Sequence, residues 1–282
     1  MGISSGEYPD PADIDRFLAE DVGTGDLTAE TLPKHLKAFA TVITREAMVL
    51  CGKHWFDGVF RRLDSGVAIE WLHAEGDWVE AGETLCRLQG PAHSLMTGER
   101  TALNLLQTLS GTATVSRCFA EAVRGTALKV LDTRKTLPGL RNAQKYAVKV
   151  GGCHNHRIGL YDGILIKENH IRAIGSIRLA VQAARQLNPN VMLEVEVESL
   201  DELDEALTAG VTRILVDEFT PAMRLEAVQR SRGLAELEVS GNVKMGDLAE
   251  IAKSGVDYVS IGSLTKHLSA VDLSMQVVIG AG

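Results

Sequence analysis

The chain has 282 residues, 45% of them hydrophobic, and a formal net charge of −8. A chain of this size can bury a large core in one or two domains, and its acidic balance argues against nonspecific nucleic-acid binding, which requires a basic surface. Because it lacks an apolar run of about 18 residues, we expect no membrane-spanning helix and no membrane partner.

The four cysteines are dispersed and form no C-x-x-C pair. They are Cys51, Cys86, Cys118 and Cys153. This spacing is typical of reduced thiols in a cytosolic protein rather than of a disulfide framework. The N-terminus also lacks the basic and then apolar pattern of a signal peptide, so we expect a cytoplasmic location. Cys153 lies near His154 and His156, but C-x-x-H without a second ligand pair is a weak metal signal.

The first part of the chain mixes helical and extended patterns. Its helical stretches place apolar residues three or four apart, and its strands are β-branched or alternate between glycine-containing turns. Asp10 or Asp13 can cap the first helix. In chain order we expect a helix over 14–21, a strand over 38–51, a helix over 53–64, three strands within 67–90 and a helix over 94–116.

The helix expected over 94–116 carries one apolar stripe, made of Leu95, Leu103, Leu106 and Leu109. Arg100 lies off this stripe, so we expect it to face solvent or a partner. A surface charge is the simplest interpretation of a single arginine on a helix.

The second part changes to short apolar runs, each ending in a polar residue or glycine. This alternation with helical segments indicates parallel strands joined by helical crossovers. The last four strand ends, Glu196, Asp217, Ser240 and Gly262, are 21, 23 and 22 residues apart, which favours an α/β barrel. No G-x-G-x-x-G follows a strand, which argues against a dinucleotide fold. We expect six strands, at 129–132, 163–167, 192–197, 213–217, 237–240 and 258–262, with helices at 174–187, 200–209, 221–232 and 244–254, and therefore an incomplete barrel.

Positive charge gathers in residues 129–168. This stretch holds eight Lys/Arg and three Asp/Glu, a charge of +5, so the remainder of the chain sums to −13. An acidic protein with one cationic segment is expected to present it to an anion. Lys145 and Lys149, four residues apart, are expected on a solvated helix face instead.

The active site of a barrel lies at the C-terminal ends of its strands. We read those strand ends in order and add the loop N-H-R at 155–157. Together they bring cations, two carboxylates and two turns of small residues to one rim. Arginine matches planar carboxylates and phosphates, and backbone N–H groups of the late turns can cradle a phosphate. Each residue alone could form an ordinary ion pair, such as Lys167 with Glu196. The rim residues are Asp132, Thr133, Arg134, Lys135, His156, Arg157, Lys167, Glu196, Asp217, Ser240, Gly241, Asn242, Ile261, Gly262 and Ser263.

Long segments of the chain resemble the quinolinate phosphoribosyltransferase family. They include D-T-R-K-T-L-P-G-L-R, N-H-R-I-G-L-Y-D-G-I-L-I-K, E-V-E-V, V-S-G-N and S-I-G-S, and the similarity begins at E-D-V-G-T-G-D-L-T near the N-terminus. The resemblance implies a transferase that moves phosphoribose from phosphoribosyl pyrophosphate to quinolinate. The expected products are nicotinate mononucleotide, pyrophosphate and CO2, in NAD biosynthesis.

The resemblance also implies a fold and a set of roles. The fold is an N-terminal α/β sandwich over 1–112, to which the tail 269–282 can return, followed by an open parallel α/β barrel over 113–268. Quinolinate is expected against Arg134, Lys135, His156, Arg157 and Lys167. Glu196 and Asp217 are expected near the ribose and Mg²⁺, which binds with phosphoribosyl pyrophosphate, and with Lys167 they form the expected catalytic set. The implied assembly is a homodimer in which Arg100 reaches the neighbouring site, and the turns at Ser240–Asn242 and Ile261–Ser263 are expected to bind phosphate.

Two departures from the family pattern stand out. Glu218 follows Asp217 where the family more often has Asn, which adds negative charge beside a pyrophosphate site. Val239 replaces a more usual Ala. Two alternatives stay open: a nicotinate-using phosphoribosyltransferase or a paralogue associated with metal transport, and a non-catalytic anion-binding barrel. Nicotinate has one carboxylate and needs fewer cations, and an anion sink gains nothing from Glu196 and Asp217.

Overall fold

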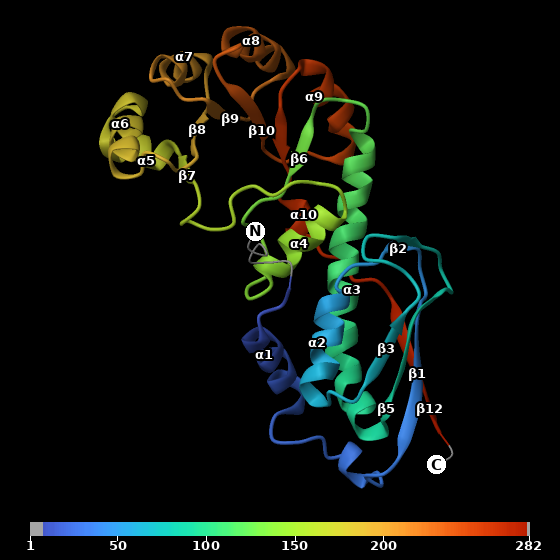
Figure 1. Ribbon diagram of the computed structural model, residues 1–282. Coiled ribbons are helices and arrows are strands. Elements are labelled where there is room, and N and C mark those ends of the chain that lie inside the picture. Colours follow the sequence, from blue (N-terminus) through green and yellow to red (C-terminus); the bar gives the residue numbers. More distant parts are fainter. Residues whose placement is uncertain (1–7, 281–282) are drawn as a thin grey trace. The chain divides into compact units, whose positions relative to one another are not determined.

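The computed structural model describes residues 8–280 (Figure 1). Residues 1–7 and 281–282 lie outside this range. The chain divides into two compact units. The first contains residues up to 117, 137–152 and those from 267 onward, and the second contains 118–136 and 153–266. This division differs from the boundary expected after residue 112, because helix α3 (Ala92–Ala122) continues beyond it.

In the first unit, Asp10 caps α1 through its side chain, which accepts a hydrogen bond from the N–H of Ala12 at 2.9 Å. The expected strand over 38–51 is interrupted. The Thr44 hydroxyl donates to the carbonyl of Glu46 at 2.6 Å and bends the chain there. The elements are α1 (Pro11–Val22), η1 (Ala29–Thr31), β1 (Lys37–Thr44), β2 (Met48–Val49), α2 (Lys53–Leu63), β3 (Ala68–Trp71), β4 (Trp78–Val79), β5 (Thr84–Pro91), α3, α4 (Arg141–Val150) and β12 (Leu273–Ile279).

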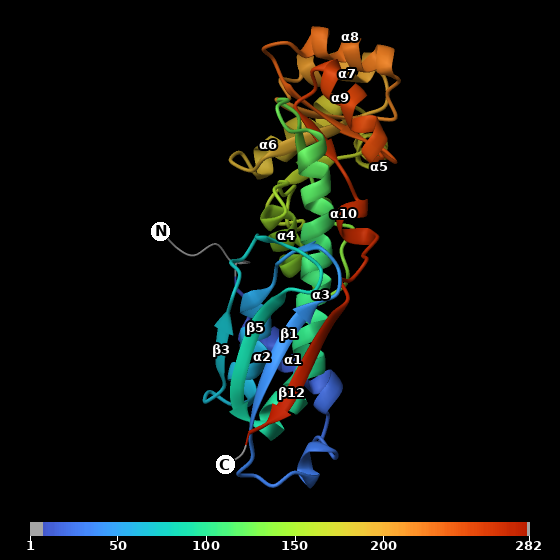
Figure 2. The ribbon, with the colours of Figure 1, turned by 90° about the vertical axis from the view of Figure 1, so that its right-hand side faces the viewer.

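The main sheet of the first unit has the strand order β12-β1-β5-β3, and β12 and β5 both pair antiparallel to β1. The chain's C-terminal segment thus supplies an edge strand, beside β1 and in front of α3 (Figure 2). The core between sheet and helices is apolar. Trp55, Val59 and Phe60 of α2 are buried, and Leu103 and Leu106 of α3 join them.

Helix α4 contains the two lysines expected on a helix face, but the solvated environment predicted for one of them is wrong. Lys149 is exposed, but Lys145 is only 1% exposed and has an interaction partner. A spacing of four residues puts two side chains on one side of a helix. It does not indicate how far that side is covered by the rest of the fold.

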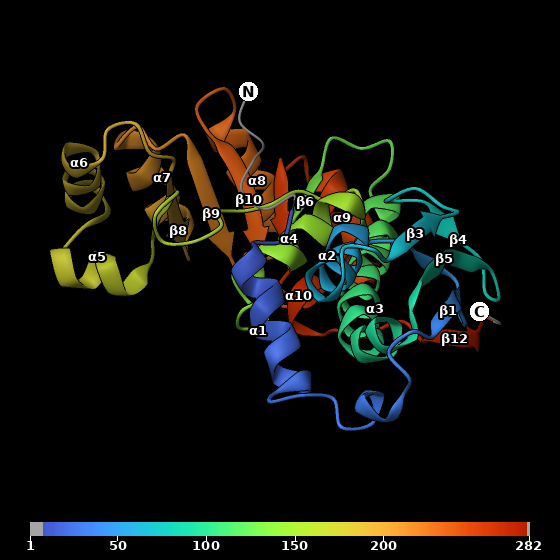
Figure 3. The ribbon, with the colours of Figure 1, turned by 60° about the horizontal axis from the view of Figure 1, so that its bottom comes forward.

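The second unit is built on a six-stranded parallel sheet with the order β6-β11-β10-β9-β8-β7, as expected for an open barrel. Figure 3 shows α6 and α7 on the outer side of β8. At one edge, His154 forms a parallel bridge to Leu131 of β6. The elements are β6 (Lys129–Leu131), β7 (Ile164–Ile166), α5 (Glu168–Ile174), α6 (Ile177–Leu187), β8 (Leu193–Val197), α7 (Leu200–Thr208), β9 (Arg213–Asp217), α8 (Pro221–Ser231), β10 (Glu236–Ser240), η2 (Met245–Asp247), α9 (Leu248–Ser254), β11 (Tyr258–Ser260) and α10 (Ser263–Lys266).

Within the described residues, no helix has both the length and the apolar character needed to cross a bilayer.

Candidate active site

A cavity of about 270 Å³ lies in the second unit, where the parallel strands end. Eight of the residues predicted from the sequence line it, from five different strand ends and loops. Leu165, Leu215, Glu238 and Ser260 also line the cavity, and they lie inside strands or at the last residue of a strand. The complete lining is Thr133, Arg134, Lys135, His156, Arg157, Leu165, Lys167, Glu196, Leu215, Glu238, Ser240 and Ser260.

Asp132 joins the two cationic segments of this wall. It is fully buried just after β6, and its carboxylate accepts hydrogen bonds from the backbone N–H of His156 at 2.9 Å and from Nδ2 of Asn155 at 2.6 Å. Charge-assisted hydrogen bonds of this kind are roughly twice as strong as neutral ones. The D-T-R-K segment after β6 and the N-H-R loop are therefore held together, which brings Arg134 near Arg157.

Arg157 is fixed by a compact loop. Its Nη1 donates to the carbonyl of Gly163 at 2.8 Å, and Asp162 accepts from the backbone N–H groups of Ile158 and Gly159 at 2.7 and 2.8 Å. Burial lowers the pKa of Arg157, and the like charge of Arg134 lowers it further. Two guanidinium groups so placed repel each other, so a bound anion would relieve this repulsion.

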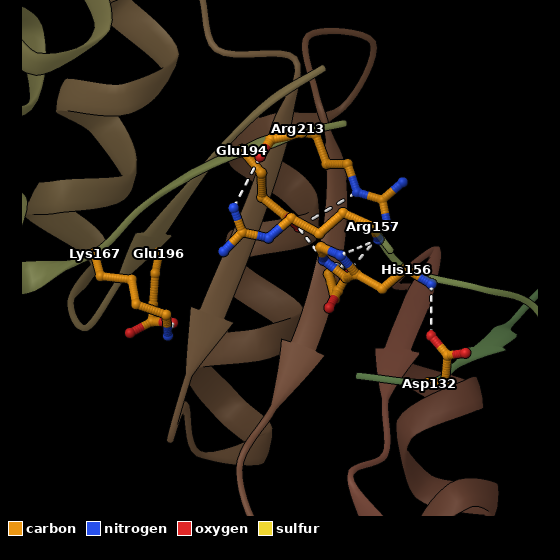
Figure 4. A network of polar contacts seen from close by, with 9 residues as sticks. Asp132, His156, Arg157, Lys167, Glu194, Glu196 and Arg213 are labelled. Carbon is orange, nitrogen blue, oxygen red and sulfur yellow. Dashed lines mark hydrogen bonds and ion pairs between the residues drawn. The ribbon is translucent and has the colours of Figure 1, made fainter. Parts of the chain in front are cut away.

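Lys167 and Glu196 form an ion pair at the ends of β7 and β8 (Figure 4). The Lys167 side chain is 45% exposed, and that of Glu196 is 11% exposed. The Lys167 ammonium is open to water, so it can leave Glu196 at lower cost than a buried cation could. Each can therefore change partner when a ligand enters.

Two glycine turns complete the rim. Gly241 has φ +99°, and a Cβ there would lie 3.4 Å from Oδ1 of Asp217; a Cβ on Gly262 would lie 3.0 Å from Cδ of Lys135. Glycine thus lets a carboxylate and a lysine approach the turns closely. Asn242 is exposed, and Ile261 is buried with its N–H donating to the carbonyl of Leu131 at 2.8 Å.

Some predicted site residues are outside the cavity lining. These are Asp132, Asp217, Gly241, Asn242, Ile261, Gly262, Ser263 and Arg100. Asp217 and the two glycines lie next to lining residues, as described above. Ser263 begins α10. Arg100 is exposed on α3 in the first unit.

A second polar layer lies below the rim and was missed in the sequence. Nε2 of His156 lies 2.8 Å from Oε2 of Glu194, Nε of Arg213 donates to Oε1 of Glu194 at 3.3 Å, and Nη2 of Arg213 donates to Oε2 of Glu238 at 2.8 Å. Figure 4 shows His156, Glu194 and Arg213 beside the Lys167–Glu196 pair. Alternate residues of a strand share a face. Glu194 and Glu238, each two residues before a predicted rim residue, could therefore have been placed on the inner face.

The two buried glutamates differ in their protonation. Burial raises the pKa of Glu238 to about 7, with the charge of Glu194 adding to the effect. Burial also acts to raise the pKa of Glu194, but the hydrogen bond from His156 and the charge of Arg213 outweigh it, so this pKa is lowered. Burial raises the pKa of Cys153 to about 12, which keeps this thiol protonated.

Comparison with known proteins gives consistent results. Residues 26–110 match the family described as quinolinate phosphoribosyl transferase, N-terminal domain, and residues 112–276 match its C-terminal domain. The chain is 40% identical to the nicotinate-nucleotide pyrophosphorylase [carboxylating] of Mycobacterium leprae, over 94% of this chain and 95% of that protein. It is 38% identical to the probable enzyme of the same name from Bacillus subtilis, over 94% and 92%.

Solved structures agree with these matches. The nicotinate-nucleotide pyrophosphorylase from Francisella tularensis superposes with a TM-score of 0.92 at 44% identity, covering 98% of this chain and 100% of that chain. Human nicotinic acid phosphoribosyltransferase has a TM-score of 0.65 at 13% identity, covering 96% and 74%. At that identity the likeness shows a common fold only.

Proposed function

We propose a set of residue roles for this chain, which belongs to the quinolinate phosphoribosyltransferase family. The enzyme transfers phosphoribose from phosphoribosyl pyrophosphate to quinolinate, with loss of CO2, and makes nicotinate mononucleotide for NAD biosynthesis. The roles below connect that reaction to the residues of the cavity.

The observation that carries the assignment is the convergence of four cations on one small cavity. Arg134, Lys135, Arg157 and Lys167 line it together, from two segments after β6 and from the end of β7. Quinolinate has two adjacent ring carboxylates, so it can use several of these donors at once. Arg157 is the proposed central contact, because its loop fixes the guanidinium before the substrate arrives.

The phosphoribosyl group is assigned to the later strands. Ser240, Gly241 and Asn242 on one turn, and Ile261, Gly262 and Ser263 on the other, are the proposed surroundings of the phosphates. Ile261 would act only by shaping its turn, since its N–H is already bonded to Leu131. Glu196 and Asp217 end neighbouring strands, and either carboxylate can stabilise positive charge that develops on the ribose.

Mg²⁺ is proposed to bind to the enzyme together with phosphoribosyl pyrophosphate. Carboxylate oxygens and phosphates suit Mg²⁺, and Glu196 and Asp217 present such oxygens at adjacent strand ends. The proposed contact is through water and substrate, because Glu196 is already paired with Lys167. When bound, the ion would offset negative charge on the pyrophosphate.

The proposed mechanism uses position and charge. The cationic wall orients quinolinate so that its ring nitrogen faces C1 of the ribose. As the C1–oxygen bond to pyrophosphate breaks, Lys167 offsets the growing negative charge and Glu196 or Asp217 stabilises the oxocarbenium-like ribose. The new N–C1 bond makes the ring cationic. The electrons of the breaking C2–carboxylate bond then move into the ring, CO2 leaves, and a proton takes its place at C2.

We also propose a homodimer in which Arg100 serves the site of the neighbouring subunit. Its exposure on α3 supports this role, because an arginine that faces outward is available to a second copy. Mixed dimers of Arg100→Ala and Arg134→Ala subunits should recover activity that neither variant has alone. If subunit exchange is verified and no activity returns, each site is built within one chain.

The proposed compartment is the cytoplasm, supported by four free cysteines. Fractionation of cells that produce the full-length protein would test this placement.

The reaction is tested by measuring both products. With quinolinate, phosphoribosyl pyrophosphate and Mg²⁺, CO2 and nicotinate mononucleotide should appear in equal amounts. With nicotinate in place of quinolinate, turnover should be much slower. Equal rates with the two pyridines would indicate the nicotinate-using alternative, and quinolinate binding without any product would indicate a paralogue with changed chemistry.

A further inference from the structure

Both ring nitrogens of His156 are engaged. The backbone N–H of Arg157 donates to Nδ1 at 2.7 Å, and Nε2 lies 2.8 Å from Oε2 of Glu194. A nitrogen that accepts a hydrogen bond carries no proton, so the single ring proton is on Nε2 and is donated to Glu194. His156 is therefore a neutral imidazole in this arrangement and adds no positive charge to the layer below the rim.

This layer then has more negative than positive charge if both glutamates are ionised. Glu194 and Glu238 are both 0% exposed, and Arg213 is the cation that contacts them, at 3.3 and 2.8 Å. Two carboxylates, one guanidinium and a neutral imidazole leave one surplus negative charge in a buried place. A surplus buried charge is costly, and one bound proton removes it.

The surroundings favour Glu238 as the group that holds this proton. Glu194 receives hydrogen bonds from His156 and Arg213, which stabilise its ionised form. Glu238 receives one, from Arg213, and its Oε1 is buried without a hydrogen-bond partner in the described part of the chain. The distance from Oε2 of Glu238 to Nε2 of His156 is 3.6 Å, too long for a hydrogen bond. The raised pKa of Glu238, about 7, agrees with this geometry.

The other charged neighbours do not supply a second cation to Glu238. Arg213 itself is held over the ring of Tyr258 on β11, with Cζ 4.1 Å from the ring centre. Arg157 interacts with Glu194 but directs Nη1 to the carbonyl of Gly163. Glu236, on the same face of β10, is an exposed carboxylate that the Tyr258 hydroxyl reaches at 3.3 Å.

A metal ion is the other way to neutralise this cluster. One ligand atom each from His156, Glu194 and Glu238 lie within 4.8 Å of one another. However, Arg213 already contacts both carboxylates, so its guanidinium stands where the cation would be needed. A metal would have to displace this arginine, and we therefore favour the proton.

We propose that Glu238 is a specificity-determining residue that carries a proton, presents a neutral carboxylic acid at the floor of the quinolinate pocket, and keeps this proton when the dianion binds. The proposal rests on the proposed position of quinolinate in the cavity that Glu238 lines. An ionised Glu238 would repel the substrate carboxylates. Binding of quinolinate and protonation of Glu238 therefore favour each other, and this coupling is reciprocal.

The test is calorimetric titration of the whole enzyme with quinolinate in two buffers that differ in ionisation enthalpy. Near neutral pH quinolinate is fully ionised, so a proton taken up on binding goes to the protein. At about pH 8 the wild type should take up a fraction of one proton per quinolinate, and less at about pH 6, where Glu238 is already protonated. Over the same range, the quinolinate KM should rise by up to about tenfold per pH unit above neutrality.

Three variants separate the possible outcomes. Glu238→Gln, the neutral isostere, should bind quinolinate without proton uptake and with a KM that changes little with pH. Glu238→Asp should restore part of the uptake, and Glu236→Gln, a matched change on the same strand face, should behave as the wild type. Uptake that persists in Glu238→Gln would put the proton on another group such as His156 and overturn the proposal, as would a wild type that binds without uptake. A metal ion that copurifies with the wild type and is lost in Glu238→Gln would also overturn it. If quinolinate does not bind at all, the proposed pocket itself is wrong.

Discussion

The inner face of the parallel sheet has two polar layers that differ in their access to water. In the rim, Lys167 is 45% exposed and pairs with Glu196, and Arg134 is exposed beside them. In the layer below, Glu194 and Glu238 are 0% exposed and share Arg213. An exposed ion pair separates at little cost, whereas removing one member of a buried pair costs several kcal/mol.

This difference in access to water indicates that the two polar layers have different roles. The rim residues can replace their contacts with one another by contacts with a substrate, so they are suited to binding and chemistry. The buried layer cannot exchange partners readily, so it fixes the orientation of His156 and the charge beneath the proposed quinolinate position. Rim changes should therefore reduce activity with little effect on stability, and changes below the rim should alter the response to pH.

The largest expected effect is at the rim, in Arg157→Ala. Losing a hydrogen bond to a charged group costs about 1.5–3 kcal/mol, so kcat/KM for quinolinate should fall by roughly 10- to 150-fold. The control is Arg172→Ala, which removes an arginine paired with Glu168 on α5 and outside the cavity. Near-normal kcat/KM in Arg157→Ala would remove this residue from the pocket.

A smaller effect is expected below the rim, in the pH dependence of stability. The pKa of Glu238 is raised from 4.5 to about 7 in the folded protein. The folded state then holds the proton more tightly than the unfolded state. This stability is fully present below about pH 4.5 and is lost as the pH rises to about 7. Glu238→Gln lacks this contribution.

Urea unfolding of the wild type and Glu238→Gln across this range would measure the effect. The free energy of unfolding of the wild type should fall relative to the variant between about pH 4.5 and about 7 and then stay level. The difference in free energy of unfolding between wild type and variant reports Glu238 alone. Glu194 is present in both proteins, and the stability that comes from its lowered pKa is lost as the pH falls. A difference that is constant with pH would mean that Glu238 holds no extra proton.

The smallest expected effect concerns Glu218, at the edge of the rim. Its φ is +53°, and in the described part of the chain it is the one residue besides glycine with positive φ. This conformation costs about 1 kcal/mol for an ordinary side chain and less for Asn. Glu218→Asn should therefore raise the free energy of unfolding by up to about 1 kcal/mol.

The same substitution removes a negative charge beside the proposed pyrophosphate position. A modest decrease in the KM for phosphoribosyl pyrophosphate should accompany the gain in stability. Glu218→Gln is the matched control, since it removes the charge and keeps the strained backbone. Equal stability of the two variants would show that the backbone conformation is not the cause.

The sequence was sufficient to predict the parallel sheet and most of the rim. Strand ends recur about every 22 residues, and a barrel brings such ends to one edge, so Arg134, Arg157, Lys167 and Glu196 could be grouped from their positions at the ends of apolar runs. The open barrel follows from the count of six strands, and the sheet has six.

Other features depend on tertiary contacts that a local pattern does not contain. The sequence does not reveal that residues 137–152 belong to the first unit, that Lys145 is buried there, or that β12 pairs with β1. Glu194 and Glu238 were overlooked because a charge inside a short strand looks like a solvent-facing position. Only the pairing of β8, β9 and β10 shows that Arg213 lies between them.

The most direct measurement is the affinity of the wild type and Arg157→Ala for quinolinate and for nicotinate, by calorimetry. If the rim recognises two carboxylates, the wild type should bind quinolinate at least about tenfold more tightly than nicotinate, and Arg157→Ala should lose most of this difference. Equal affinity of the wild type for the two pyridines, or a difference that Arg157→Ala leaves unchanged, would contradict the assignment of the cationic rim to quinolinate.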